Sequence, residues 1–265
     1  MRSAFVLIRI FSAALALLAA ASGYAACSDE DFVTRVGGGD ECFVVKTFGA
    51  APGTPTLLVW LHGSVSAGGP ADYMYRDAQR YASDSVASVA LLLHGYADRN
   101  GNASTGDNYN RQSAMATSKN VDSLAAALVK LKEHYRPQRL VLLGHSTGAV
   151  FAADILALSP GLVDAVFLAG CPCEKPFNWR GVNPITLAEA VPLGAQVLAF
   201  TGSNDTVVPP GLVTGYIDGL KKRGVDARYI EIPGATHSWK SLFNNEIAEG
   251  GLQALLPQKM VEKGQ

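Results

Sequence analysis

Short apolar runs alternate with stretches of helical spacing along the first half of the chain. Residues 42–48, 56–63, 88–95 and 139–144 are rich in valine and leucine, end at glycine or polar residues, and predict strands. Apolar side chains recur every three or four residues in 118–135, and Pro137 follows, which predicts a helix.

The second half continues the alternation. The expected order is a helix over 147–158, strands over 163–170 and 195–202, a helix over 211–224 and a strand over 227–234. An irregular segment, 171–194, separates the first two of these strands. Near-continuous apolar strands between helices predict an α/β fold in one domain, with a mainly parallel sheet covered by helices on both faces.

The first 26 residues have a different character from the rest. Arg2 and Arg9 flank an apolar start, an apolar run covers 10–21, and small residues precede Cys27. This pattern predicts an export signal peptide over residues 1–26, cleaved near Ala25 or Ala26, followed by one domain over 27–265. The alternatives are a membrane anchor that is retained, or a buried first helix.

Four cysteines bear on the compartment. Cys27 stands where a bacterial lipoprotein carries its lipid, but Tyr24 occupies the place where such signals usually have a leucine-like residue. An even number of cysteines in an oxidising compartment favours two disulfides. Of the three possible pairings, Cys27–Cys42 with Cys171–Cys173 is the most local. Two buried reduced thiols are the alternative for the second pair. We expect a secreted or periplasmic protein without stable membrane insertion after signal cleavage.

The charge of the chain excludes one class of partner. Its formal net charge is -1, and no run of lysine and arginine forms a patch. Nucleic acid is therefore not an expected partner.

A serine lies between two glycines in the sequence GHSTG, immediately after the predicted strand 139–144. Gly144 and Gly148 leave room where strand and helix come close, and this context predicts a nucleophile elbow with Ser146 at its tip. The alternative is that Ser146 only caps the following helix.

Two further side chains complete the pattern of a catalytic triad. Asp205 follows the predicted strand 195–202, and His237 follows the strand 227–234. The order serine, aspartate, histidine is the one expected after such an elbow. Glu174, after the preceding strand, is the rival acid.

The segments GHSTG, GSNDTVVP, GATHSW and WLHGS resemble those of the α/β-hydrolase superfamily, and the resemblance covers nearly all of residues 43–260. The chain looks most similar to secreted bacterial esterases of the feruloyl-esterase and polyester-depolymerase kind, and to the catalytic domains of prolyl-oligopeptidase-like hydrolases. The resemblance implies Ser146 as nucleophile, His237 as base and acid, and Asp205 as the group that orients the histidine. It implies no metal, no cofactor and little or no cap domain.

The resemblance also implies an oxyanion hole, which needs two donors. One is the backbone N–H of Thr147, and the other is the N–H of Ser64, with that of Val65 as the neighbouring alternative. His145 is expected to pack beside the elbow. For His62 and His94 a structural role and contact with substrate are both open.

Two polar segments flank the expected site. They suggest Tyr109, Arg111 and Trp179, together with His62, as substrate contacts. The function expected is that of an exported serine hydrolase acting on carboxylic esters, in a small molecule or a polymer. The alternatives are a prolyl-oligopeptidase-like peptidase, and a binding module without chemistry on the same fold.

Overall fold

A single eight-stranded sheet organises the computed structural model, which describes residues 27–49, 51–109, 116–174 and 181–256. Its order is β1-β2-β4-β3-β5-β6-β7-β8, with β1 and β2 antiparallel to their neighbours and the other pairs parallel. The strands are β1 (Arg35–Gly38), β2 (Glu41–Phe48), β3 (Thr56–Leu61), β4 (Val86–Leu91), β5 (Arg139–His145), β6 (Ala165–Ala169), β7 (Gln196–Gly202) and β8 (Asp226–Ile232). The predicted mainly parallel sheet is confirmed.

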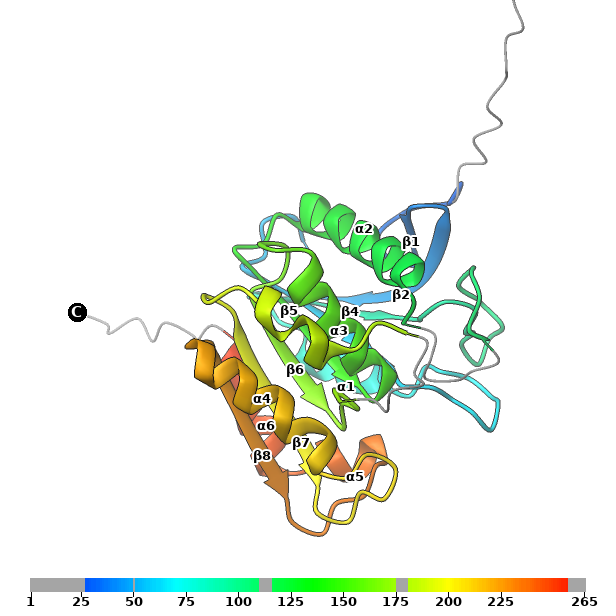
Figure 1. The fold of residues 1–265 in the computed structure, drawn as a ribbon. Coiled ribbons are helices and arrows are strands. Elements are labelled where there is room, and N and C mark those ends of the chain that lie inside the picture. The colour runs from blue at the N-terminus through cyan, green and yellow to red at the C-terminus, as the bar shows by residue number, and fades with distance from the viewer. Residues whose placement is uncertain (1–26, 50, 110–115, 175–180, 257–265) are drawn as a thin grey trace, which may run out of the picture.

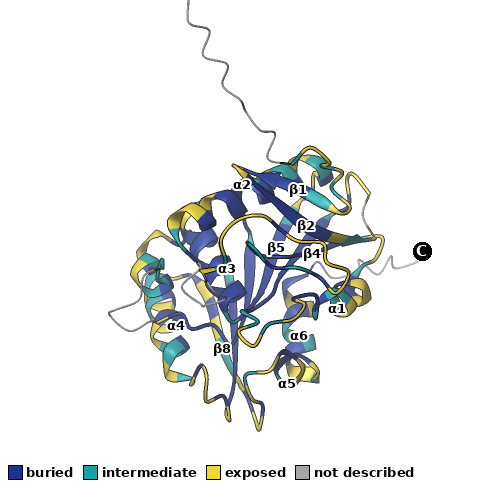
Figure 2. Cartoon of the chain, turned by 90° about the vertical axis from the view of Figure 1, so that its right-hand side faces the viewer, coloured by how far each residue is buried: buried dark blue, intermediate teal, exposed yellow. Residues whose placement is uncertain are grey.

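Helices cover both faces of the sheet (Figures 1 and 2). On one face lie α2 (Ser118–Tyr135), α3 (Thr147–Leu158), α4 (Gly211–Arg223) and the 3-10 helix η3 (Pro184–Ala190). On the other lie α1 (Tyr75–Tyr81), α5 (Trp239–Phe243) and α6 (Glu246–Leu255). Two hydrophobic clusters result, one on each side of the sheet.

The central strands supply alternate side chains to the two clusters. In β3, Leu57 and Val59 pack under α2 and α3, whereas Leu58 and Trp60 pack under α1 and α5, and all four are fully buried. A strand that is buried on both faces has no polar face. Burial on both faces therefore explains the near-continuous apolar runs in the sequence.

Capping side chains and residues in the left-handed region determine where the helices begin and end. The Thr117 side chain caps α2 by accepting the N–H of Asn120, and Arg136 ends that helix in the left-handed region. Gly224 ends α4 with φ 89°. Five short elements were not predicted: β1, α1, η3, α5 and α6. Of these, η3 lies within the segment 171–194 that was predicted to be irregular.

Both preferred disulfides are present, joining Cys27 to Cys42 and Cys171 to Cys173, and the described residues contain no free cysteine. The alternative of reduced thiols is therefore wrong. In the described part of the chain, no cap domain covers the carboxyl ends of the strands, and no helix has the length and apolar character needed to cross a membrane. The signal peptide predicted for residues 1–26 lies outside the described residues.

Candidate active site

Ser146 occupies the sharp turn between β5 and α3, with φ 51° and ψ −116°. The turn depends on close backbone approach: a Cβ on Gly144 would lie 2.3 Å from the Gly148 carbonyl oxygen, and one on Gly148 would lie 2.1 Å from that of Leu61. Both glycines are therefore required. The Ser146 side chain makes no capping hydrogen bond to α3, so the alternative of a helix cap is wrong.

The side chains predicted to act with Ser146 form one line of hydrogen bonds. His237 Nε2 lies 3.0 Å from Ser146 Oγ, and His237 Nδ1 lies 2.7 Å from Asp205 Oδ2. Because a carboxylate can only accept, Nδ1 carries the proton and Nε2 is left to accept the serine O–H. This arrangement can take a proton from Ser146 as its oxygen attacks an electrophile.

Asp205 is fixed on its other side as well. Its side chain is fully buried, and Oδ1 accepts the backbone N–H of Val207 at 3.0 Å and of Val208 at 2.7 Å. Glu174 lies elsewhere, because its backbone N–H bonds to Leu212 at the start of α4 and its side chain approaches Gly215 on that helix. Asp205, and not Glu174, is the carboxylate that contacts His237.

The loop after β3 lies against the elbow, since a Cβ on Gly63 would come within 2.9 Å of Ser146 Cβ. The Gly63 N–H donates to the Tyr73 hydroxyl at 2.5 Å, and the Val65 N–H to the Tyr96 hydroxyl at 3.3 Å. Among the described residues, the Ser64 N–H has no acceptor. Of the three successive N–H groups of Gly63, Ser64 and Val65, that of Ser64 is therefore the one without an acceptor among the described residues.

The second donor expected for an oxyanion hole is the Thr147 N–H. It belongs to the first residue of α3, where the helix supplies no acceptor. The side chains of Thr147 and Ser64 are joined by a 2.8 Å hydrogen bond between their hydroxyl groups. This bond ties the loop after β3 to the start of α3.

The prediction that His62 contacts the substrate is wrong. The ring is buried, its Nδ1 donates to the Gly63 carbonyl at 2.7 Å, and its Nε2 accepts the Leu93 N–H at 3.0 Å. Burial lowers the pKa of His62 to about 4. His62 therefore holds two strand ends together as a neutral ring. His94 is also buried, with Nε2 2.8 Å from the Ser123 hydroxyl, so its role is structural too.

The other predicted substrate contacts have separate outcomes. Tyr109 is 38% exposed with φ 47°, and its N–H donates to the Asp107 side chain at 2.6 Å. Tyr109 does not line the groove beside the elbow, which is described next. Arg111 and Trp179 lie outside the described residues.

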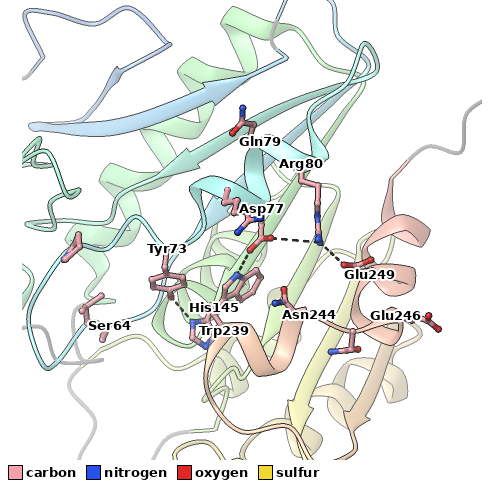
Figure 3. A pocket seen from close by; sticks show the side chains of 15 residues that line it. Ser64, Tyr73, Asp77, Gln79, Arg80, His145, Trp239, Asn244, Glu246 and Glu249 are labelled. Atoms are coloured by element: carbon pink, nitrogen blue, oxygen red, sulfur yellow. Dashed lines mark hydrogen bonds and ion pairs between the residues drawn. The ribbon is translucent and has the colours of Figure 1, made fainter.

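A groove of about 1130 Å³ opens beside the elbow. Ser64, Tyr73 and His145 lie at one end, and Arg80 and Glu249, joined by a 2.7 Å ion pair, lie toward the other (Figure 3). Sequence reasoning missed the contribution of α1, α5 and α6 to this groove, because no motif marks their residues. The described residues contain no cluster of histidine, cysteine and carboxylate side chains arranged to hold a metal ion.

His145 packs beside the elbow as predicted. Its ring is buried, its Nδ1 lies 2.7 Å from the Tyr73 hydroxyl, and its Nε2 lies 2.9 Å from the His237 carbonyl oxygen. Burial, and next the charge on His237, lower the pKa of His145 to about 3. A ring that stays neutral and is bonded through both nitrogens is not available as the base for Ser146.

Solved structures with the same fold include three hydrolases. A lid-less α/β serine hydrolase of Xanthomonas campestris is 16% identical, with a TM-score of 0.57, and the match covers 84% of this chain and 94% of that one. An esterase of Pyrococcus furiosus is 15% identical, with a TM-score of 0.58 and coverage of 83% and 87%. Thermogutta terrifontis esterase 2, solved after phosphoramylation by tabun, is 14% identical, with a TM-score of 0.60 and coverage of 85% and 92%.

Sequence comparison supplies the family. Comparison with curated protein sequences gives no match. The model of the dienelactone hydrolase family matches residues 78–254, which is more than half of the chain and includes the elbow and the segments that carry Asp205 and His237. The chain therefore belongs to the dienelactone hydrolase family and is a hydrolase of the α/β-hydrolase fold.

Proposed function

We propose that this hydrolase is exported and cleaves carboxylic esters through an acyl-enzyme intermediate on Ser146. The observation that carries the proposal is the line of hydrogen bonds from Asp205 through His237 to the strained serine at the elbow. Each member follows a different strand, yet all three meet at one edge of the sheet. A buried carboxylate, an imidazole and a serine hydroxyl in this order form the device that activates a serine nucleophile.

In the acylation step, Ser146 Oγ attacks the ester carbonyl carbon while its proton passes to His237 Nε2. The carbonyl oxygen gains negative charge in the tetrahedral intermediate and receives hydrogen bonds from the N–H groups of Ser64 and Thr147. The C–O bond to the alcohol then breaks, and His237 returns its proton to the departing oxygen. Asp205 stabilises the imidazolium while it exists.

Deacylation repeats the sequence with water. His237 Nε2 takes a proton from a water molecule, whose oxygen attacks the acyl carbon, and the bond to Ser146 Oγ breaks as the serine regains a proton. The products are a carboxylic acid and the regenerated enzyme. No step needs a metal or an organic cofactor.

An ester is the preferred substrate over a peptide because an alkoxide leaves more readily than an amine. The groove of about 1130 Å³ beside the elbow leaves room for a substituent larger than an acetyl group, whether in a small molecule or a polymer. A prolyl-oligopeptidase-like activity would use the same three residues. It would be revealed by a higher kcat/KM on proline-containing peptides than on aryl esters.

Export is supported by the leader-like residues 1–26 and by the two disulfides, which persist in oxidising compartments. The Cys27 thiol is bonded to Cys42 and so does not carry a lipid in this form. Cell fractionation with mass measurement of the mature protein tests this part. A diacylglyceryl group on Cys27 would replace the proposal of a secreted or periplasmic enzyme by that of a lipoprotein.

The decisive experiment for the nucleophile is labelling with a fluorophosphonate probe. Phosphoramylation of the Thermogutta esterase by tabun makes an organophosphorus reagent a suitable choice. The probe should label the protein on Ser146, and Ser146→Ala should abolish both labelling and hydrolysis of p-nitrophenyl acetate. Ser159→Ala, at the other end of α3, should behave like the wild type. Full labelling of the Ser146→Ala protein would reject the assignment, and a protein that neither reacts nor hydrolyses would indicate a binding module.

A further inference from the structure

A second chain of hydrogen bonds runs beside the one formed by Asp205, His237 and Ser146. The Gly63 N–H donates to the Tyr73 hydroxyl at 2.5 Å, and that hydroxyl lies 2.7 Å from His145 Nδ1. His145 Nε2 lies 2.9 Å from the backbone oxygen of His237. Figure 3 shows the Tyr73 hydroxyl directed at the His145 ring, and the two rings are nearly perpendicular, with an interplanar angle of 85°.

The direction of every bond in this chain is fixed. The His237 carbonyl can only accept, so the single proton of the neutral His145 ring lies on Nε2. Nδ1 is then an acceptor, which makes the Tyr73 O–H its donor, and the Tyr73 oxygen in turn accepts the Gly63 N–H. The low pKa of the buried His145, about 3, keeps the ring in this form at neutral pH.

These hydrogen bonds join three backbone segments whose relative positions matter for the proposed reaction. Gly63 precedes Ser64, the proposed donor to the oxyanion, and His145 precedes the nucleophile itself. The His237 carbonyl belongs to the same residue as the imidazole that takes the proton. Asp205 holds this imidazole by its Nδ1, whereas His145 holds the backbone that carries it.

We propose that Tyr73 and His145 are positioning residues that set the place of His237 and of the Ser64 loop relative to Ser146. This inference rests on the proposed function, because it assigns those two groups their parts in ester hydrolysis. Neither Tyr73 nor His145 transfers a proton in the reaction. Their hydroxyl and imidazole act through residues that do.

Contacts with two tilted aromatic rings support the same role for His145. Its ring centroid lies 5.2 Å from that of His237 and 5.6 Å from that of Trp239, the first residue of α5. Trp239 is itself anchored by a 2.7 Å hydrogen bond from its Nε1 to Asp77 on α1. His145 therefore packs against two neighbouring rings, and a rotation of its own ring would break both of its hydrogen bonds.

Tyr73→Phe removes one oxygen and tests the proposal directly. A displacement of reacting groups of about 1 Å costs up to about 100-fold in rate, so kcat for p-nitrophenyl acetate should fall by about 10- to 100-fold while KM changes little. The rate is to be expressed per active site titrated with the fluorophosphonate, which removes unfolded protein from the count. Tyr75→Phe is the matched control, because the buried Tyr75 hydroxyl has no hydrogen-bond partner among the described residues. Its kcat should equal that of the wild type.

A pair of substitutions at position 145 separates positioning from packing. Glutamine can donate to the His237 carbonyl and accept from Tyr73, whereas leucine fills a similar volume without either bond. His145→Gln should therefore retain more kcat per titrated site than His145→Leu, and Tyr73→Phe added to His145→Leu should cost little more. Equal rates for the two variants, or an unchanged kcat in Tyr73→Phe, would overturn the proposal. Labelling of the wild type on Ser146 would still support the proposed function in that case.

Discussion

Asp154 is a buried carboxyl group on α3 that the proposed reaction does not use. Its side chain is fully buried, and neither carboxyl oxygen has a hydrogen-bond partner among the described residues. Burial raises the pKa of Asp154 from 3.8 to about 8. The group is therefore protonated in the folded protein at neutral pH, whereas in the unfolded chain it is ionised.

This difference makes stability depend on pH in a defined direction. Between pH 4 and pH 8 the folded protein holds a proton that the unfolded chain has lost, so the free energy of unfolding falls as the pH rises. With a pKa of 3.8 in the unfolded chain and about 8 in the folded protein, Asp154 makes the protein about 3 kcal/mol less stable at pH 7 than at pH 5. Above pH 8 the loss is complete.

Asp154→Asn removes the titration and keeps the size of the side chain. Urea unfolding, followed by circular dichroism with the disulfides intact, should show the variant gaining about 3 kcal/mol relative to the wild type on going from pH 5 to pH 7. Asp218→Asn, which changes an exposed carboxylate on α4, should show no such gain. A constant difference between Asp154→Asn and the wild type at the two pH values would refute the reasoning.

Four further predictions follow from particular contacts. Asp205→Asn should lower kcat by about 10⁴-fold, as the wrong histidine tautomer is then favoured, whereas Glu174→Gln should leave kcat/KM unchanged. Ser64→Pro, which removes the backbone donor, should cost about 10²- to 10³-fold in kcat, and Ser64→Ala much less, in the same steady-state assay. His62 has a pKa of about 4 folded and 6.5 unfolded, so stability is lost as the pH falls below 6.5, and His62→Gln should abolish a loss of about 2 kcal/mol between pH 7 and pH 5 in urea titrations. Cys42→Ser opens a loop with a sequence separation of 15 and should cost about 3 kcal/mol in the same titrations.

The sequence predicts those parts of the site whose chemistry leaves a local pattern. Gly144 and Gly148 are marked by their spacing around Ser146, because close backbone approach forbids a side chain at both positions. Asp205 and His237 are marked by their place after strands, since the carboxyl ends of parallel strands share one edge. The long apolar strands are marked by burial on both faces.

What the sequence does not predict lacks such a pattern. The hydrogen bond between Tyr73 and His145 joins residues 72 positions apart, and no spacing rule links them. The helices α1 and α5 have 7 and 5 residues, too few for a helical period to stand out. The sequence does not decide the role of His62, because a histidine after a strand has the same local sequence whether its ring faces a ligand or, as here, the core.

The reacting groups and the groove rest on different parts of the fold. Ser146, Asp205 and His237 follow β5, β7 and β8, and the backbone packs tightly around them: a Cβ on Gly170, which has φ 55°, would lie 3.1 Å from His237 Nδ1. The groove instead runs over α1, α5 and α6 on one face of the sheet. Substitutions on these helices can therefore change which ester is accepted without moving the strand ends that carry the chemistry. Tyr73 and His145 lie where the two parts meet, because both line the groove, Tyr73 accepts the Gly63 N–H beside the elbow, and His145 bonds to the His237 backbone oxygen.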